Sequence, residues 1–80
     1  MTISDRVLDV LVRVSEVGDV RDNPDVRLYD LQILDSMRTV ALIVAFLSEF
    51  GVEISLAELD REDWATPRKI VSYLERKLAA

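Results

Sequence analysis

Apolar residues near the N-terminus recur at spacings of three and four, with charged residues mostly between them. The apolar positions are Ile3, Val7, Val10, Leu11 and Val14. These spacings place them on one face of an α-helix. We therefore predict an amphipathic helix from about Thr2 to Val17, closed by Gly18 because glycine is the usual residue after a helix end.

The helical period is lost between Gly18 and Asp35. Turn-forming residues come first, namely Asp19, Asp22, Asn23, Pro24 and Asp25, and a mixed apolar and polar segment follows. A loop of this length is uncommon in a compact domain and is usually functional. We expect it to be ordered, pinned to the core by Leu28, Tyr29, Leu31 and Leu34.

The helical period returns from Ser36 to Phe50 and predicts a second helix, ended by Gly51. At about 100° per residue, one arc of this helix should face the core and contains Leu42, Ile43, Phe46 and Phe50. A neighbouring arc is also apolar and contains Met37, Val40, Ala41 and Val44. A helix that is apolar nearly all round is either buried or presents part of its surface to a partner, and we favour the partner.

Two further helices are predicted in the C-terminal third. Ser55 and Glu58 have the spacing of a capping box, so a short third helix should follow and end before Trp64. Thr66 and Pro67 supply an N-cap and a first helical residue for a fourth helix. Its buried stripe should consist of Ile70, Val71, Leu74 and Leu78. Trp64 is expected to be a core side chain that joins the third and fourth helices.

These elements predict an all-α fold, a bundle of three long helices and one short helix, in a single domain over residues 1–80. Half of the residues are apolar and 31% are charged, which is a globular composition. The formal charge of -5 argues against nucleic-acid binding, because the ten basic residues are scattered among fifteen acidic ones.

The absence of cysteine and histidine excludes most catalytic and metal-binding designs. We therefore expect no catalytic residue and no metal ligand set. The longest apolar stretch, Val40 to Leu47, is far too short to span a membrane, and the N-terminus lacks the pattern of a secretory signal. These features predict a cytoplasmic protein that is not embedded in a membrane.

Asp35 and Ser36 stand where the irregular segment turns into the apolar second helix. Asp and Ser are common helix N-caps, because their side-chain oxygens accept the free backbone N–H groups of the first turn. An exposed serine at this position could instead carry a prosthetic group. The two residues alone leave both interpretations open.

The order of elements, with Asp-Ser at the start of an apolar helix, resembles the acyl and peptidyl carrier protein family over nearly the whole chain. Leu34-Asp35-Ser36-Met37 is similar to the attachment motif of this family. The resemblance implies an acyl-carrier-protein-like four-helix bundle. It further implies 4′-phosphopantetheine on Ser36, added by a phosphopantetheinyl transferase, with Asp35 as a motif residue. In this interpretation the partner-docking residues are Met37, Val40, Ala41 and Val44.

A narrower resemblance lies in the segment from Asp60 to Pro67 and in Lys69-Ile70-Val71, which are similar to D-alanyl carrier proteins. It implies a monomeric, non-catalytic carrier of a D-alanine thioester. An ATP-dependent D-alanine ligase would load it, and a membrane acyltransferase would transfer the D-alanine to a cell-wall polymer such as teichoic acid. Gln32 replaces a usual glycine, so we expect a different loop conformation there.

Two other functions remain open at this point. One is an aminoacyl or acyl carrier of another biosynthetic pathway. The other is an unmodified helical interaction module that binds a protein through its exposed apolar face, with Ser36 acting only as a helix cap.

Overall fold

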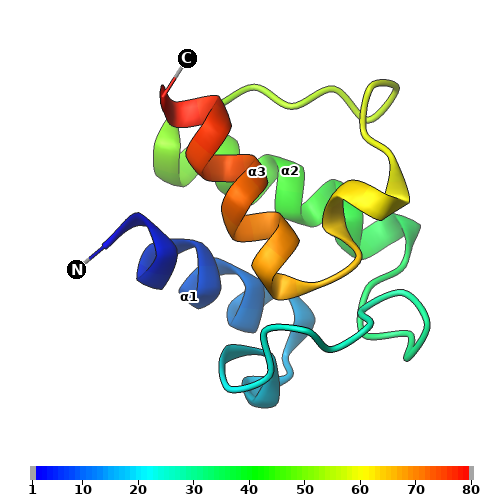
Figure 1. The fold of residues 1–80 in the computed structure, drawn as a ribbon. Helices are drawn as coiled ribbons and strands as arrows, with labels where there is room; N and C mark the ends of the chain where they lie inside the picture. Colours follow the sequence, from blue (N-terminus) through cyan, green and yellow to red (C-terminus); the bar gives the residue numbers. More distant parts are fainter. Residues whose placement is uncertain (1, 80) are drawn as a thin grey trace.

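Three α-helices form the body of the protein. The computed structural model describes residues 2–79, so Met1 and Ala80, the ends of the expected domain, lie outside the described residues. The α-helices are α1 (Ile3–Ser15), α2 (Ser36–Phe50) and α3 (Pro67–Ala79), and two short 3₁₀ helices are η1 (Gly18–Arg21) and η2 (Arg61–Trp64). Helix α1 packs against both α2 and α3 (Figure 1). No strand occurs within residues 2–79, which agrees with the predicted all-α class.

The expected fourth, short helix is not confirmed as an α-helix. Ser55 and Glu58 form a turn, in which the Glu58 amide donates to the Ser55 carbonyl at 3.1 Å. Helix η2 follows and includes Trp64, whereas the predicted helix ended before it. A single short turn needs apolar contacts to continue as a helix, and Leu56 within this turn is exposed.

The ends of α1 differ slightly from the prediction. Thr2 is the N-cap, and its hydroxyl accepts the Asp5 amide at 3.1 Å. The helix ends at Ser15, because Glu16 takes the left-handed conformation (φ 60°) and its amide donates to the Val12 carbonyl at 2.8 Å. The predicted closure at Gly18 is therefore wrong, since Gly18 begins η1 instead.

The core lies between the three α-helices and is closed by Trp64. The buried apolar side chains are Val7, Val10, Leu11, Val20, Leu28, Leu34, Leu42, Phe46, Ile54, Trp64, Ile70 and Leu74. Trp64 meets Phe46 and Tyr73 edge to face, with ring centres 5.6 and 5.9 Å apart. Thr66 caps α3 as predicted, because its hydroxyl accepts the Lys69 amide at 3.2 Å. The predicted core role of Trp64 is confirmed.

Backbone hydrogen bonds and an ion pair fix the long loop before α2 to the start of α3. The Leu28 amide donates to the Ala65 carbonyl, and the Arg68 amide donates to the Pro24 carbonyl, both at 2.9 Å. The Arg68 guanidinium also donates twice to Asp25, at 2.9 and 3.2 Å. These hydrogen bonds lower the pKa of Asp25 below its usual value. The loop is therefore ordered, as the sequence predicted.

Three of the four expected anchors of this loop pack against the core, and one does not. Leu28 and Leu34 are buried and Tyr29 is half-buried, but Leu31 is 62% exposed. Leu31 lies in a tight turn in which its amide donates to the Arg27 carbonyl, and its side chain faces outward. The prediction for Leu31 is wrong.

Gln32 takes the left-handed conformation, with a φ of 60°. Glycine adopts this region without strain, whereas a residue with a Cβ does not. The loop thus has a backbone suited to glycine at this position, although the residue is glutamine.

Candidate functional site

Ser36 is the first residue of α2, and its side chain is exposed. Asp35 provides the N-cap, since its carboxylate accepts the Arg38 amide at 2.8 Å and its carbonyl accepts the Thr39 amide at 2.8 Å. The Ser36 hydroxyl makes no hydrogen bond with any of residues 2–79. The structure therefore assigns the cap to Asp35 and leaves the Ser36 hydroxyl free for chemistry.

A chain of hydroxyl groups holds the start of α2 in place. The buried Thr39 hydroxyl donates to the Asp35 carbonyl at 2.7 Å. The Tyr29 hydroxyl lies 2.7 Å from the same Thr39 oxygen, and because the Thr39 proton is already used, Tyr29 is the donor. The loop thereby supports the residue directly before Ser36. The role of Thr39 and this role of Tyr29 were not predictable from the sequence pattern, because the contact joins side chains ten positions apart.

Arg38 ties α2 to the end of α1. Its guanidinium donates to the Ser15 carbonyl at 2.6 Å and to the Ile33 carbonyl at 3.2 Å, and it lies 3.8 Å from the Glu16 carboxylate. The Ser15 carbonyl is at the C-terminal end of α1, where carbonyls lack a helical partner, and the Ile33 carbonyl belongs to the loop before α2. Arg38 thus has a structural role, which the helical pattern alone did not indicate.

The four apolar residues predicted to dock a partner lie together on the exposed face of α2. We call Met37, Val40, Ala41 and Val44 the apolar stripe, and all four side chains are exposed. Met37 is 82% exposed and Val44 is 60% exposed. Ser36, Met37, Val40 and Leu56 line one shallow hollow, so the stripe begins beside the free serine. The core arc lies on the other side, where Leu42 and Phe46 are buried and Ile43 and Phe50 are partly buried.

The surroundings of Ser36 suit a phosphodiester. Asp35 accepts the Arg38 and Thr39 amides, and the two amides before them, with the helix dipole, add partial positive charge at the start of α2. Arg61 from η2 lines the same small cleft as Ser36. An exposed hydroxyl beside these groups can carry an anionic group on a covalent ester bond.

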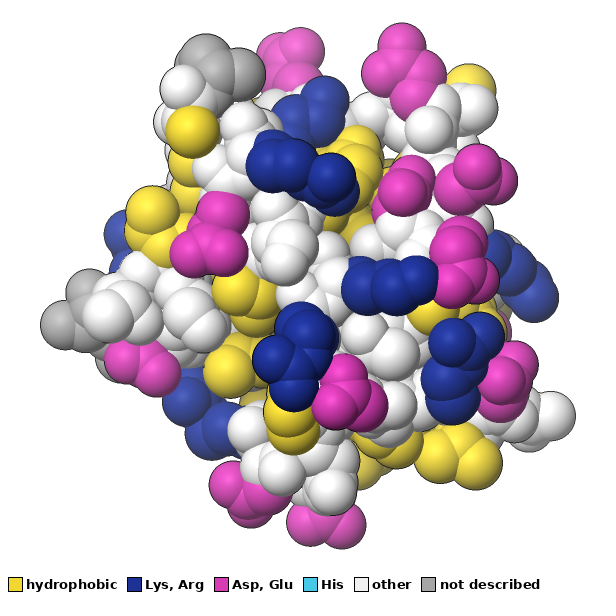
Figure 2. Space-filling model, in the orientation of Figure 1, with side chains coloured by type: hydrophobic (Ala, Val, Ile, Leu, Met, Phe, Trp, Pro, Cys, Tyr) yellow, Lys and Arg dark blue, Asp and Glu magenta, His cyan; other side chains and the backbone are white. Residues whose placement is uncertain are grey.

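Other kinds of site are not found in the described part of the chain. Within residues 2–79, no three acidic, histidine or cysteine side chains gather in a way that could hold a metal ion. Across the same range, no helix combines the length and the apolar character that crossing a bilayer requires. Acidic and basic side chains are interspersed over the face seen in Figure 2, without a continuous basic area.

Comparisons with known proteins agree with this geometry. Residues 5–74 match the family described as "Phosphopantetheine attachment site". The chain is 43% identical to a D-alanyl carrier protein of Staphylococcus saprophyticus subsp. saprophyticus over 75 residues, which cover 94% of this chain and 96% of that protein. It is 41% identical to a D-alanyl carrier protein of Staphylococcus xylosus, with the same coverage.

The chain belongs to the phosphopantetheine attachment site family, because the match covers most of its length. The expected class, a carrier protein with covalent 4′-phosphopantetheine and not an enzyme, is confirmed by these comparisons.

Proposed function

We propose that this protein, as one carrier domain over residues 1–80, carries 4′-phosphopantetheine on Ser36 and holds D-alanine as a thioester. The D-alanine is then passed to a cell-wall polymer such as teichoic acid. The observation that carries the proposal is the exposed Ser36 hydroxyl at the start of α2. Asp35, and not Ser36, caps this helix. The two related D-alanyl carrier proteins support the choice of cargo.

The prosthetic group supplies the chemistry that the polypeptide lacks. The chain has no cysteine, and the phosphopantetheine arm ends in a thiol that can form the thioester. The protein contributes the attachment point and the surroundings of the phosphodiester. Asp35, Thr39 and Tyr29 hold the start of α2, so the arm leaves from a rigid position.

Three partners follow from this function. A phosphopantetheinyl transferase modifies Ser36, an ATP-dependent D-alanine ligase loads the thiol, and a membrane acyltransferase receives the D-alanine. We propose that these enzymes contact the apolar stripe (Met37, Val40, Ala41 and Val44), because it is exposed and begins beside Ser36. The carrier acts as a monomer in the cytoplasm, where coenzyme A and ATP are available.

The attachment is tested by incubating the unmodified protein with coenzyme A and a broad-specificity phosphopantetheinyl transferase. Intact mass spectrometry should detect one added 4′-phosphopantetheine on the wild type and none on Ser36→Ala. Ser48→Ala is the matched control, since Ser48 is an exposed serine of the same helix, and this variant should be modified normally. An adduct on Ser36→Ala, or none on the wild type, would contradict the proposal.

The cargo is tested separately on the modified protein. With ATP and a D-alanine ligase, the mass should increase by one alanyl group, and D-alanine should be preferred over L-alanine. Mass spectrometry of the thioester on protein isolated from its native host checks the assignment in the cell. A different amino or acyl group there would assign the carrier to another pathway without affecting the role of Ser36.

A further inference from the structure

The small cleft beside Ser36 contains an arginine, Arg61, on its η2 side. The cleft has a volume of about 100 Å³ and lies between the start of α2, the preceding loop and η2. Tyr29, Ser36 and Thr39 line one part of it, and Asp60 and Arg61 line another. In Figure 1, η2 and the start of α2 lie on the same side of the molecule.

The Arg61 guanidinium lies over an aromatic ring and has no acidic partner among residues 2–79. Its central carbon lies 5.0 Å from the centre of the Tyr29 ring. That ring is fixed in turn by the hydrogen bond between the Tyr29 and Thr39 hydroxyl groups. Arg27 and Arg68 form ion pairs with carboxylates, but no ion pair within residues 2–79 involves Arg61. The cation is therefore positioned and available for an anion.

The charges around Ser36 favour an added cation once a phosphate is present. Asp35 and Asp60 flank the cleft region with two negative charges, and a phosphodiester on Ser36 adds a third. The start of α2 offsets only about half a charge. A guanidinium matches phosphate oxygens well, because it is planar, always charged and can donate two parallel hydrogen bonds.

We propose that Arg61 binds the phosphodiester of the 4′-phosphopantetheine on Ser36 and thereby positions the first part of the arm along the cleft. This inference rests on the proposed attachment to Ser36. Arg61 is a positioning residue, since it acts on the phosphate and not on the thioester.

Thermal unfolding of the unmodified and modified proteins at low salt tests the proposal. The quantity of interest is the change in Tm that modification causes within each variant, so that effects of a substitution on the unmodified fold are subtracted. We expect the Tm of the modified protein minus that of the unmodified protein to be about 2–5 °C lower for Arg61→Gln than for the wild type. High salt should reduce the difference, because the contact is near the surface.

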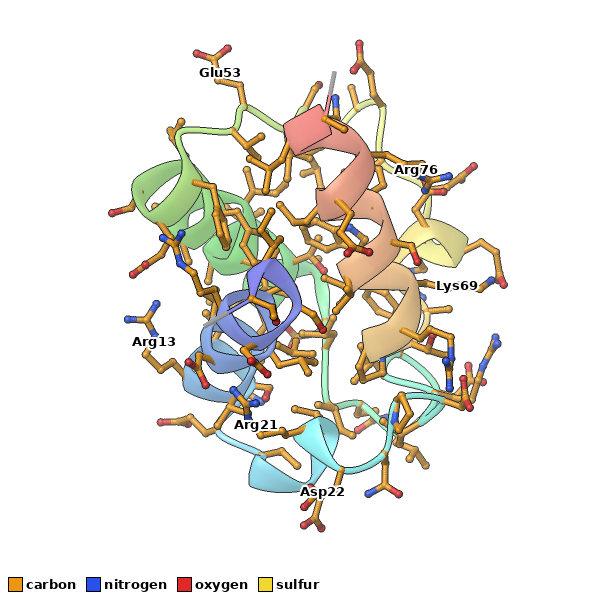
Figure 3. All side chains as sticks on the ribbon, turned by 60° about the vertical axis from the view of Figure 1, so that its left-hand side comes forward. Arg13, Arg21, Asp22, Glu53, Lys69 and Arg76 are labelled. Carbon is orange, nitrogen blue, oxygen red and sulfur yellow. The ribbon has the colours of Figure 1, made fainter. Side chains whose placement is uncertain are left out.

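Arg13→Gln is the matched control, because it removes the same charge from an exposed arginine of α1. Figure 3 shows Arg13 on the opposite side of the ribbon from η2. Its modification-dependent change in Tm should equal that of the wild type. Asp60→Asn should increase the Tm of the modified protein relative to the unmodified one, since it removes a negative charge from the cleft that holds the phosphate.

NMR spectroscopy of the wild type gives a second readout that needs no substitution. The side-chain Nε resonance of Arg61 should shift on modification, and the phosphorus resonance should differ between the modified wild type and modified Arg61→Gln. If modification changes the Tm of the wild type and of Arg61→Gln equally and the Arg61 resonance does not shift, the proposed role of Arg61 is overturned. The proposed attachment to Ser36 would not be affected by that result. If the wild type accepts no phosphopantetheine at all, both this inference and the proposed function fail.

Discussion

Substitution of Val44 by Asp should separate partner docking from folding. Val44 is the last residue of the apolar stripe along α2 and is 60% exposed, so about two fifths of its surface is buried. Complete burial of a valine side chain contributes about 1.5–3 kcal/mol, so the substitution should cost about 0.6–1.2 kcal/mol of unfolding free energy. For a chain of this size, that loss lowers the Tm by about 2–10 °C and leaves the protein folded.

Val44→Asp should reduce loading by the ligase more strongly than it reduces stability. A carboxylate placed in an apolar contact is desolvated without a partner, and we expect it to cost about 2 kcal/mol of binding free energy, as a substitution at an interface hot spot does. The corresponding decrease in kcat/KM is about 30-fold. The assay follows D-alanylation of the modified protein by intact mass spectrometry at several carrier concentrations, and far-ultraviolet circular dichroism checks the fold.

Ile3→Asp is the matched control for this experiment. Ile3 is 41% exposed and lies at the start of α1, near the end of α2 that is remote from Ser36. This variant should be loaded at the wild-type rate. Normal loading of Val44→Asp would refute docking through the apolar stripe. Unfolding of Val44→Asp without a separable loading defect would show that Val44 belongs to the core.

Three other predictions concern stability. Phe46→Ala should cost about 3–5 kcal/mol in chemical denaturation, because Phe46 is fully buried against Trp64, and a loss below about 1 kcal/mol would contradict this packing. Gln32→Gly should raise the unfolding free energy by about 0.5–1 kcal/mol, since glycine adopts the left-handed conformation without the strain that a Cβ causes. A decrease in unfolding free energy would show that the glutamine is not strained. The hydrogen bonds from Arg68 lower the pKa of Asp25 in the folded state, so their contribution is present above the unfolded pKa and is lost as the pH falls through the folded pKa. The stability difference between wild type and Asp25→Asn should therefore narrow in melts from about pH 5 to about pH 2, and a constant difference would refute the coupling.

The sequence predicted the start of α2 well because the signals there are local. Asp35 and the apolar residues that follow it lie within a few positions of Ser36, and a helix cap acts over the same distance. The same reasoning failed at Ser55 and Glu58, where the capping-box pattern is present but Leu56 is exposed and only a turn forms. A capping pattern stabilises a helix that packing has already made favourable, and it does not form one alone.

The loop before α2 was only partly predictable. Its apolar residues indicated that it packs against the core, and Leu28 and Leu34 are indeed buried. Which of its side chains face outward depends on the turn around Leu31 and on the left-handed Gln32, and neither has a periodic pattern. Irregular backbone has no repeat from which the direction of a side chain could be derived.

The sequence by itself determined the three α-helices, the position of Asp35 and Ser36 at the start of α2 and the two apolar arcs of that helix, because helix periodicity and capping act between residues that are close along the chain. The structure then showed that Asp35 is the cap and that the Ser36 side chain is exposed. Only the tertiary structure decided what surrounds that serine. Tyr29 reaches Thr39, and Arg61 reaches Tyr29, through contacts between segments that are distant in the sequence. Hydrogen bonds such as that from Leu28 to Ala65 set the path of these segments, and they join residues whose spacing no local pattern records.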